Sequence, residues 1–219
     1  MVNEKEPLQT LEEIKTMMER NSRFVSLSGW SGVAAGICGL IAAWLAGKKI
    51  DEHGINVNGY GATPDYMADG KLPELHRELL MLALITFFAA LIFAFLYSYL
   101  RSRKTGIPIW GYMARRVVIN VAVPMIAGGL LIWRMTDFGF YSLVAPASLL
   151  FYGLALINAS KFTLSEVRYL GYLQLLLGIV NLWVIGYGLY FWAAGFGLLH
   201  IVYGLVMWNK YERNEKAVA

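Results

Sequence analysis

The sequence predicts an all-α integral membrane protein, a bundle of six transmembrane helices preceded by a short amphipathic helix. Hydrophobic residues make up 58% of the 219-residue chain and charged residues only 16%. A soluble surface accommodates such a composition poorly, because it must be mostly wettable. The apolar residues also fall into blocks of about twenty, the length that a helix needs to cross a bilayer. Lys and Arg gather in alternate connections between these blocks, as in multi-pass membrane proteins.

Residues 1–23 are polar and form a separate N-terminal segment. Thr10 and Glu13 have the spacing of a helix-capping box. Apolar residues then recur at helical intervals from Leu8 to Met18. The segment is either an amphipathic helix on the inner membrane surface or a solvated leader that folds back on the bundle. It contains no apolar stretch, so no cleavable signal peptide is expected.

Six apolar blocks occupy the membrane domain, residues 24–209. They are residues 24–47, 79–100, 117–133, 140–159, 169–188 and 189–208. The last two blocks have almost no linker, and Gly186-Tyr187-Gly188 is the expected turn because glycine tolerates positive φ. Pro124 and Pro146 are expected to kink their helices. Residues 210–219 form a polar C-terminal tail.

The distribution of Lys and Arg predicts the orientation. Fourteen lie in the N-terminal tail, the second and fourth connections and the C-terminal tail, whereas five lie on the opposite side. Because cytoplasmic segments retain the excess of Lys and Arg, both termini are predicted to be cytoplasmic. The net charge of +4 is then explained by anionic lipid head groups, and nucleic acid is not an expected partner.

The connection at about residues 48–78 is the only long one, and it is predicted to lie outside. It contains six acidic residues together with His53 and His76. Their spacing matches no closed metal site, and no cysteine contributes, so a solvated acidic loop is favoured over a metal centre. Arg134 and Asp137 flank another outer turn and are expected to form a local ion pair.

Two hairpins near the C-terminus resemble each other. Phe138-Gly139-Phe140-Tyr141 and Tyr187-Gly188-Leu189-Tyr190 begin similar blocks, which end in Asn158 and Asn209. The resemblance favours a parallel helical-hairpin repeat rather than the inverted repeat of many transporters.

Glycine pairs seven residues apart, followed by Leu or Ile, recur in the predicted spans and are typical of close helix packing. They include Gly32 and Gly39, Gly171 and Gly178, and Gly197 and Gly204. Seven residues is close to two helical turns, so each pair lies on one stripe where a neighbouring backbone can approach.

Polar residues inside the predicted spans form the candidate intramembrane site. They are Asn120, Tyr152, Gln174, Asn181, His200 and Tyr203. Gln174 and His200 each follow the first glycine of a pair by three residues, so they are expected to face a common interface and share a partner. Such residues either line a polar cavity or pin the bundle by hydrogen bonds between helices. Asn158 and Asn209 are expected to end their helices.

No catalytic motif is present. The chain has no Ser-His-Asp order, no His-Glu-x-x-His and no phosphate-binding Gly-rich loop ending in Lys-Ser or Lys-Thr. We therefore expect no enzyme activity, no cofactor and no bound metal.

Several stretches resemble a family of bacterial six-span membrane proteins, found mainly in Bacteroidota-type organisms, that has no assigned activity. These stretches are residues 11–20, Ser26-Leu27-Ser28-Gly29, Arg115-Arg116 leading into Pro124, and residues 158–171. The resemblance implies the same topology and an inner-membrane location, but no substrate and no catalytic residue.

Two classes of function fit the sequence. The first is a small transporter or channel-like bundle for an unidentified solute. The alternative is a non-transporting sensor or partner subunit that acts through its N-terminal helix and basic second loop. Either class fits a homo-oligomer or a complex with another membrane protein. A water-accessible cavity lined by Gln174, Asn181 and His200 would favour transport.

Overall fold

A computed structural model describes residues 28–53, 71–106 and 110–213. The described residues are all-helical and contain no strand, which confirms the predicted all-α class. The N-terminal segment 1–23, the middle of the long connection and the end of the C-terminal tail lie outside the described residues.

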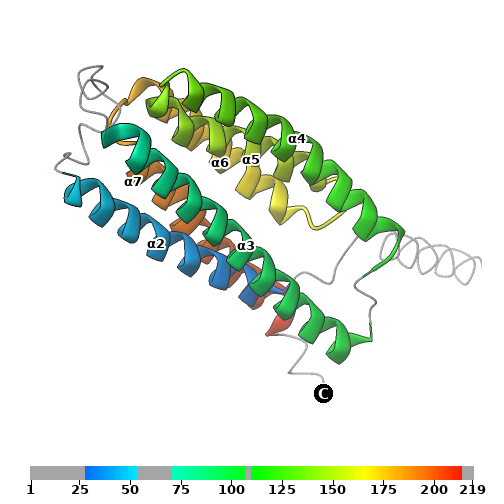
Figure 1. The fold of residues 1–219 in the computed structure, drawn as a ribbon. Helices are drawn as coiled ribbons and strands as arrows, with labels where there is room; N and C mark the ends of the chain where they lie inside the picture. Colours follow the sequence, from blue (N-terminus) through cyan, green and yellow to red (C-terminus); the bar gives the residue numbers. More distant parts are fainter. Residues whose placement is uncertain (1–27, 54–70, 107–109, 214–219) are drawn as a thin grey trace, which may run out of the picture.

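The described helices run side by side and alternate in direction (Figure 1). They are α2 (Gly29–Glu52), α3 (Lys71–Thr105), α4 (Tyr112–Asp137), α5 (Val144–Ala159) and α6 (Glu166–Trp183). A continuous last helix, Gly188–Glu212, comprises α7 (Gly188–Trp192), a π-helical segment Ala193–Leu199, α8 (His200–Met207) and a second π-helical segment Trp208–Glu212. A 3₁₀ turn, Tyr141–Leu143, leads into α5.

Five of these helices are long and apolar enough to cross a membrane, namely α2, α3, α4, the last helix and the segment Tyr141–Ala159. Helix α6 is not among the five. It begins with Glu166 and Arg168 and carries Gln174 and Asn181, which lower its mean hydropathy. The turn before the last helix is as predicted: α6 ends at Trp183, and Gly186 has φ of +92°.

The long connection is shorter than the sequence predicts. Helix α2 continues to Glu52 and α3 begins at Lys71, so the residues near both ends of the predicted loop are helical. Hydropathy marks only the apolar part of a helix, whereas the backbone hydrogen bonds continue through the charged turns beyond it. Lys49 on α2 and Glu78 on α3 form an ion pair of 2.8 Å across these turns.

Glycines bring the helices of the bundle into close contact. A Cβ atom on Gly36 would lie 2.6 Å from the Gly197 carbonyl oxygen, and one on Gly204 would lie 2.5 Å from the Val33 amide nitrogen. These contacts join α2 to the last helix. Helices α5 and α6 meet in the same way, because a Cβ on Gly153 or on Gly171 would lie 2.9 Å from the other's carbonyl oxygen.

All six glycines of the predicted pairs lie at such contacts. The Cβ positions of Gly32 and Gly39 face the last helix, those of Gly197 and Gly204 face α2, and those of Gly171 and Gly178 face α5. Side chains of any size would push these backbones apart, so the glycines set the helix spacing.

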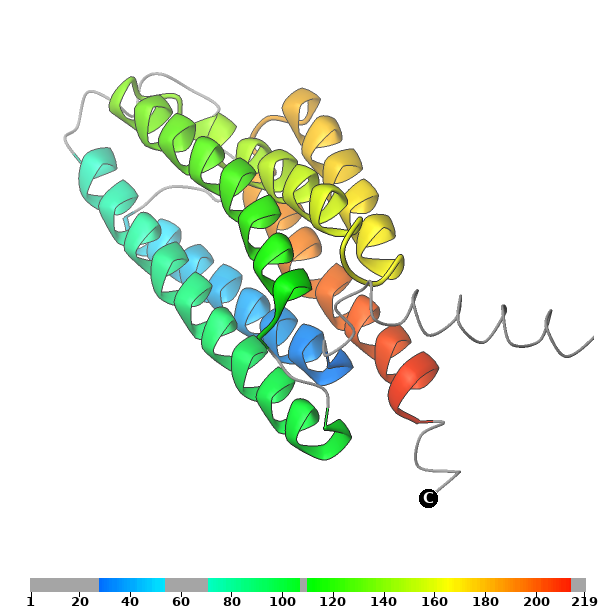
Figure 2. The same ribbon diagram turned by 90° about the vertical axis from the view of Figure 1, so that its right-hand side faces the viewer.

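Helices α3 and α4 lie at the two edges of the bundle. Helix α3 packs mainly on α2, and α4 mainly on α5 (Figures 1 and 2). None of the most apolar stretch of α3 is buried, compared with 44% of that of α2. Helices α3 and α4 together expose twenty large apolar side chains.

Candidate functional site

Three of the six predicted polar residues come together in the middle of the bundle. Tyr152 lies on α5, Gln174 on α6 and His200 on the last helix, at the junction between its first π-helical segment and α8. Gln174 is fully buried and His200 is 7% exposed. Helices α5 and α6 pack on each other, and both contact the last helix.

Gln174 and His200 share one hydrogen-bond acceptor, the carbonyl oxygen of Gly195. Gln174 Nε2 donates to it at 2.8 Å, and His200 Nδ1 lies 2.9 Å from it. Gly195 belongs to the π-helical segment Ala193–Leu199. Segments of this kind break the regular i to i−4 ladder, and they occur frequently at functional sites.

His200 extends the cluster to α5 through its other ring nitrogen. Because a carbonyl can only accept, Nδ1 carries the proton, and in the neutral ring Nε2 is then an acceptor. The Tyr152 hydroxyl lies 2.8 Å from Nε2 and donates to it. The Phe196 ring lies beside both, with ring centroids 5.1 Å from Tyr152 and 6.2 Å from His200.

The cluster fits closely around Gly195. A Cβ at this position would lie 2.4 Å from Leu149 Cδ2 and 2.5 Å from Gln174 Oε1. Gln174 Oε1 is buried and has no hydrogen-bond partner among the described residues. Its oxygen therefore packs against the Gly195 backbone while its amide nitrogen bonds the Gly195 carbonyl.

The other three predicted residues lie apart from this cluster. Asn181 is on α6, seven residues after Gln174, and its Nδ2 donates to the Val184 carbonyl at 3.2 Å, beyond the helix end. Its Oδ1 is buried without a partner among the described residues. The ring of Tyr203 lies against Gly32 of α2. Asn120 is on α4 and bonds its own helix, with Nδ2 2.8 Å from the Arg116 carbonyl.

Asn158 lies in the last turn of α5, as expected, and its side chain also bonds α4. It donates from Nδ2 to the backbone carbonyl of Asn120, at 3.2 Å. Pro124 lies four residues after Asn120 and has no N–H, so this carbonyl loses its normal helical partner. The Asn158 side chain replaces that bond and joins α5 to α4. The four-residue spacing of Asn120 and Pro124 is the signal that was available in the sequence.

Pro146 differs from expectation. It lies in the first turn of α5, which begins at Val144. The first N–H groups of a helix have no partner within the helix, so proline is tolerated there without a broken hydrogen bond. Asn209 lies within the second π-helical segment, where its Oδ1 accepts from Arg213.

A second polar cluster, centred on Glu212, joins the end of the last helix to the ends of α2 and α3. Glu212 Oε1 accepts from the Gly29 amide at 2.5 Å, from Ser28 Oγ at 3.0 Å and from Arg101 Nη1 at 3.2 Å. The carboxylate thus caps the N-terminus of α2, where the helix dipole favours negative charge, and pairs with Arg101 near the end of α3.

Glu166 makes a comparable tie at the same end of the bundle. Its Oε1 accepts from Lys210 and, at 2.9 Å, from the Tyr211 hydroxyl. Partial burial opposes ionisation of the carboxyl, but the hydrogen bonds from Lys210 and Tyr211 prevail and lower the pKa of Glu166 below its usual value. The last helix therefore contacts α2, α3 and α6 through its own charged end.

At the opposite end of the bundle, the Lys49–Glu78 ion pair joins α2 to α3. Arg134 and Asp137 form an exposed pair of 3.4 Å on successive turns of α4. His53 Nδ1 lies 2.8 Å from the Lys49 carbonyl, and the His76 ring lies against that of Tyr141, with centroids 3.4 Å apart and the planes tilted by 40°. Within residues 28–53, 71–106 and 110–213, no group of three or more His, Cys, Asp and Glu residues is placed to hold a metal ion.

The chain matches no protein-family model, and comparison with curated proteins and with solved structures finds no similar chain.

Proposed function

We propose that the protein spans the bacterial inner membrane six times, with both termini in the cytoplasm. Five helices have the required length and apolar character, and α6 runs beside α5 as the sixth. At the end of the bundle where α3 ends and α4 begins, the described residues of all the helices and connections include nine Lys and Arg but only two acidic residues. The other end of the bundle has five of each. This asymmetry supports the basic end as cytoplasmic.

Cysteine labelling in whole cells tests the topology. In a Cys38→Ala background, Asp137→Cys is expected to react with a membrane-impermeant thiol reagent, whereas Lys161→Cys reacts only after permeabilisation. Both positions are exposed, so accessibility of the side chain is matched. Labelling of Lys161→Cys in intact cells would contradict the orientation.

Within this topology, the function that the geometry supports best is a non-transporting membrane sensor or partner subunit. The observation that carries this proposal is the closed polar core. The Tyr152 hydroxyl bonds His200, and His200 and Gln174 both bond the Gly195 carbonyl oxygen. The packing leaves no room for a Cβ atom at Gly195. A polar path for a solute needs groups that face water, whereas these groups face each other. Contacts with other proteins are then made at the basic end and through the N-terminal segment.

A small transporter is the second candidate, and one observation favours it. Gln174 Oε1 and Asn181 Oδ1 are buried acceptors without partners among the described residues. They lie two helical turns apart on α6, on the side that faces the last helix. Unpaired acceptors cost free energy inside a membrane, and water or a solute donor would satisfy them.

Water access to these two positions separates the candidates. We expect Gln174→Cys and Asn181→Cys, each in the Cys38→Ala background, to resist a small water-soluble thiol reagent in membrane vesicles. Asp137→Cys serves as the reactive control. Rapid modification of both core cysteines would support transport instead. Proton flux into liposomes that contain the purified protein and an entrapped pH-sensitive dye would support it further.

A further inference from the structure

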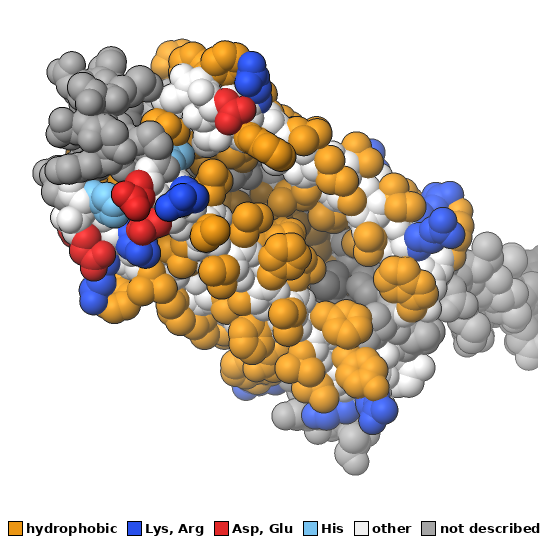
Figure 3. All heavy atoms as spheres, viewed as in Figure 1, with side chains coloured by type: hydrophobic (Ala, Val, Ile, Leu, Met, Phe, Trp, Pro, Cys, Tyr) orange, Lys and Arg blue, Asp and Glu red, His pale blue; other side chains and the backbone are white. Residues whose placement is uncertain are grey.

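The two edge helices leave an open groove between them. Helices α3 and α4 are consecutive in the chain but pack on different neighbours, α2 and α5. Figure 3 shows a hollow between them that is lined with hydrophobic side chains. Exposed residues of α3 include Leu84, Ile85, Phe88, Leu91, Ile92 and Phe95, and those of α4 include Val118, Ile119, Val123, Ile126 and Leu130.

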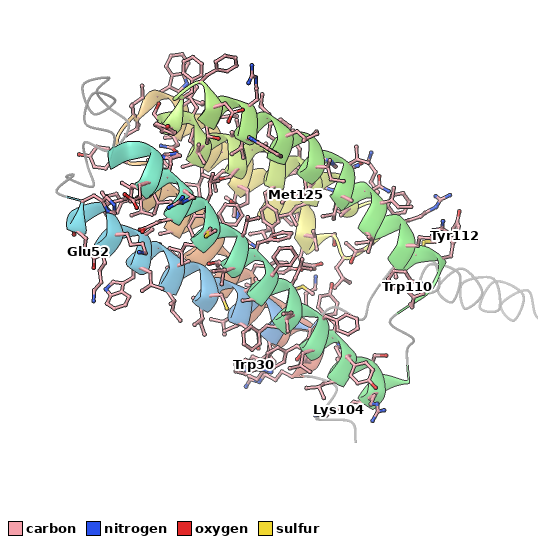
Figure 4. All side chains as sticks on the ribbon, viewed as in Figure 1. Trp30, Glu52, Lys104, Trp110, Tyr112 and Met125 are labelled. Carbon is pink, nitrogen blue, oxygen red and sulfur yellow. The ribbon has the colours of Figure 1, made fainter. Side chains whose placement is uncertain are left out.

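One mouth of this groove is strongly basic. Arg103 and Lys104 lie in the last turn of α3, and Arg115 and Arg116 lie near the start of α4. Figure 4 shows Lys104 and Tyr112 at the same end of the bundle, on the two helices that border the groove. The sequence from 101 to 116 contains no acidic residue.

These four cations have no carboxylate partner among the described residues. Arg103 lies 5.1 Å from the Tyr99 ring centroid, and Arg116 lies 4.6 Å from that of Tyr112. Stacking on an aromatic ring orients a guanidinium and leaves its N–H donors available. The opposite mouth differs, because Glu74, Glu78 and Asp137 lie there beside Arg77 and Arg134.

We propose that the α3–α4 groove binds anionic phospholipids, with their acyl chains along the apolar walls and their phosphates at its two basic rims, Arg103 and Lys104 on α3 and Arg115 and Arg116 on α4. The charge of the mouth selects the head group, since Lys and Arg near the cytoplasmic surface attract anionic lipids. The length of the apolar walls suits acyl chains. A neutral lipid leaves the four cations unmatched. The inference rests on the proposed membrane insertion and on the basic end being cytoplasmic.

Lipid retention by the purified protein tests this inference. In native mass spectrometry from detergent, the full chain is expected to retain phosphatidylglycerol at least tenfold more than phosphatidylcholine with the same acyl chains. The variant Arg103→Gln/Lys104→Gln/Arg115→Gln/Arg116→Gln is expected to lose most of that preference, by fivefold or more.

A matched control separates a local site from general attraction to the basic end. Lys161 and Arg213 are exposed at that end but lie outside the groove mouth, so Lys161→Gln/Arg213→Gln is expected to keep the preference for phosphatidylglycerol. An equal loss in this control overturns the proposal, as does equal retention of the two lipids by the wild type. A stable dimer that excludes lipid also overturns it, because a second copy then occupies the groove.

A second experiment tests membrane insertion separately from the lipid site. Extraction of cell membranes with alkaline carbonate reports whether the chain is integral. A chain released by carbonate contradicts the membrane proposal itself. A chain that stays in the membrane but shows no preference for phosphatidylglycerol contradicts only the lipid site.

Discussion

The last helix and α3 are both apolar enough to cross a membrane, yet they are held in opposite ways. The last helix contacts α2 through glycines, α5 and α6 through the Gly195 cluster, and α2, α3 and α6 again through Glu212 and the Lys210–Tyr211 pair. Helix α3 packs mainly on α2 and exposes its apolar side chains. Polar and small residues, rather than hydropathy, therefore distinguish the central helix from the edge helix.

This difference follows from the energetics of a lipid environment. Where the surroundings are hydrocarbon, burying a leucine against another helix gains little, because lipid is equally apolar. Close backbone contact and hydrogen bonds between helices remain as the forces that select one arrangement. We expect substitutions to be costly in proportion to the number of such contacts they break, whatever the hydrophobicity of the residue.

The largest effect is expected at a glycine of the central interface. Gly204→Ala places a Cβ 2.5 Å from the Val33 amide and 2.6 Å from the Gly29 carbonyl, and these are backbone atoms that cannot turn aside. We expect the free energy of unfolding to fall by about 1–3 kcal/mol. Gly129→Ala on α4 is the matched control, because nothing lies within 4 Å of its Cβ position. Its thermal stability in detergent is expected to be unchanged or to rise by up to about 1 kcal/mol from helix propensity. Equal losses in the two variants would show that the glycine contacts are not specific.

A comparable effect is expected where Asn158 replaces the bond lost at Pro124. Asn158→Leu leaves the Asn120 carbonyl without a partner and is expected to cost about 1–3 kcal/mol. Pro124→Ala restores an N–H four residues after Asn120, so in that background the same substitution is expected to cost clearly less. Asn209→Leu is the control, because its hydrogen bond to Arg213 is exposed. A double-mutant cycle on melting in detergent measures the coupling, and additive losses would contradict the assignment.

The Tyr152–His200 hydrogen bond is expected to show the same coupling between its two partners. His200→Leu removes the acceptor of the Tyr152 hydroxyl and is expected to cost about 1–3 kcal/mol. Adding Tyr152→Phe removes the stranded hydroxyl, so the double variant is expected to recover part of that loss. If the double variant is no more stable than His200→Leu alone, the unpaired Tyr152 hydroxyl does not account for the loss. Melting curves of the two single variants and the double variant decide between these outcomes.

A smaller effect, dependent on pH, is expected at the end of the bundle where Glu166 lies. Because the pKa of Glu166 is lower in the folded protein than its ordinary value of 4.5, its contribution to stability is present at neutral pH and is lost as the pH falls below about 4.5. Glu166→Gln is therefore expected to lose stability at pH 7 but to differ little from wild type near pH 3. The melting temperature as a function of pH provides the measurement.

Much of the fold was predictable because hydropathy blocks and glycine spacing are local signals. The all-α class, the Gly186 turn and the stripes that carry Gly197 and Gly204 could be derived from residue order alone. The common interface of Gln174 and His200 was inferred from their matching positions. The identity of the partner that they share could not be inferred, because it is a backbone carbonyl, and any residue supplies one. The π-helical segment around Gly195 has no sequence signature of its own.

The edge position of α3 was not predictable for a different reason. A helix that is apolar on all sides has no distinct face, so its periodicity does not say which side packs or how much. The role of Asn158 required knowledge of which helix lies beside α5. In both cases the missing information is the order in which helices pack, which the distribution of polar residues only partly encodes.

Photolabelling from the lipid phase tests the contrast between the central and edge helices most directly. Membranes that contain the wild-type protein and a phospholipid with a diazirine in its acyl chain are irradiated, and the labelled residues are located by mass spectrometry. We expect label on α3 at Ile85, Phe88 and Ile92, and none at Leu149, Gln174 or Met207, which are buried. Absence of label from α3, or label at the three buried residues, would contradict the account.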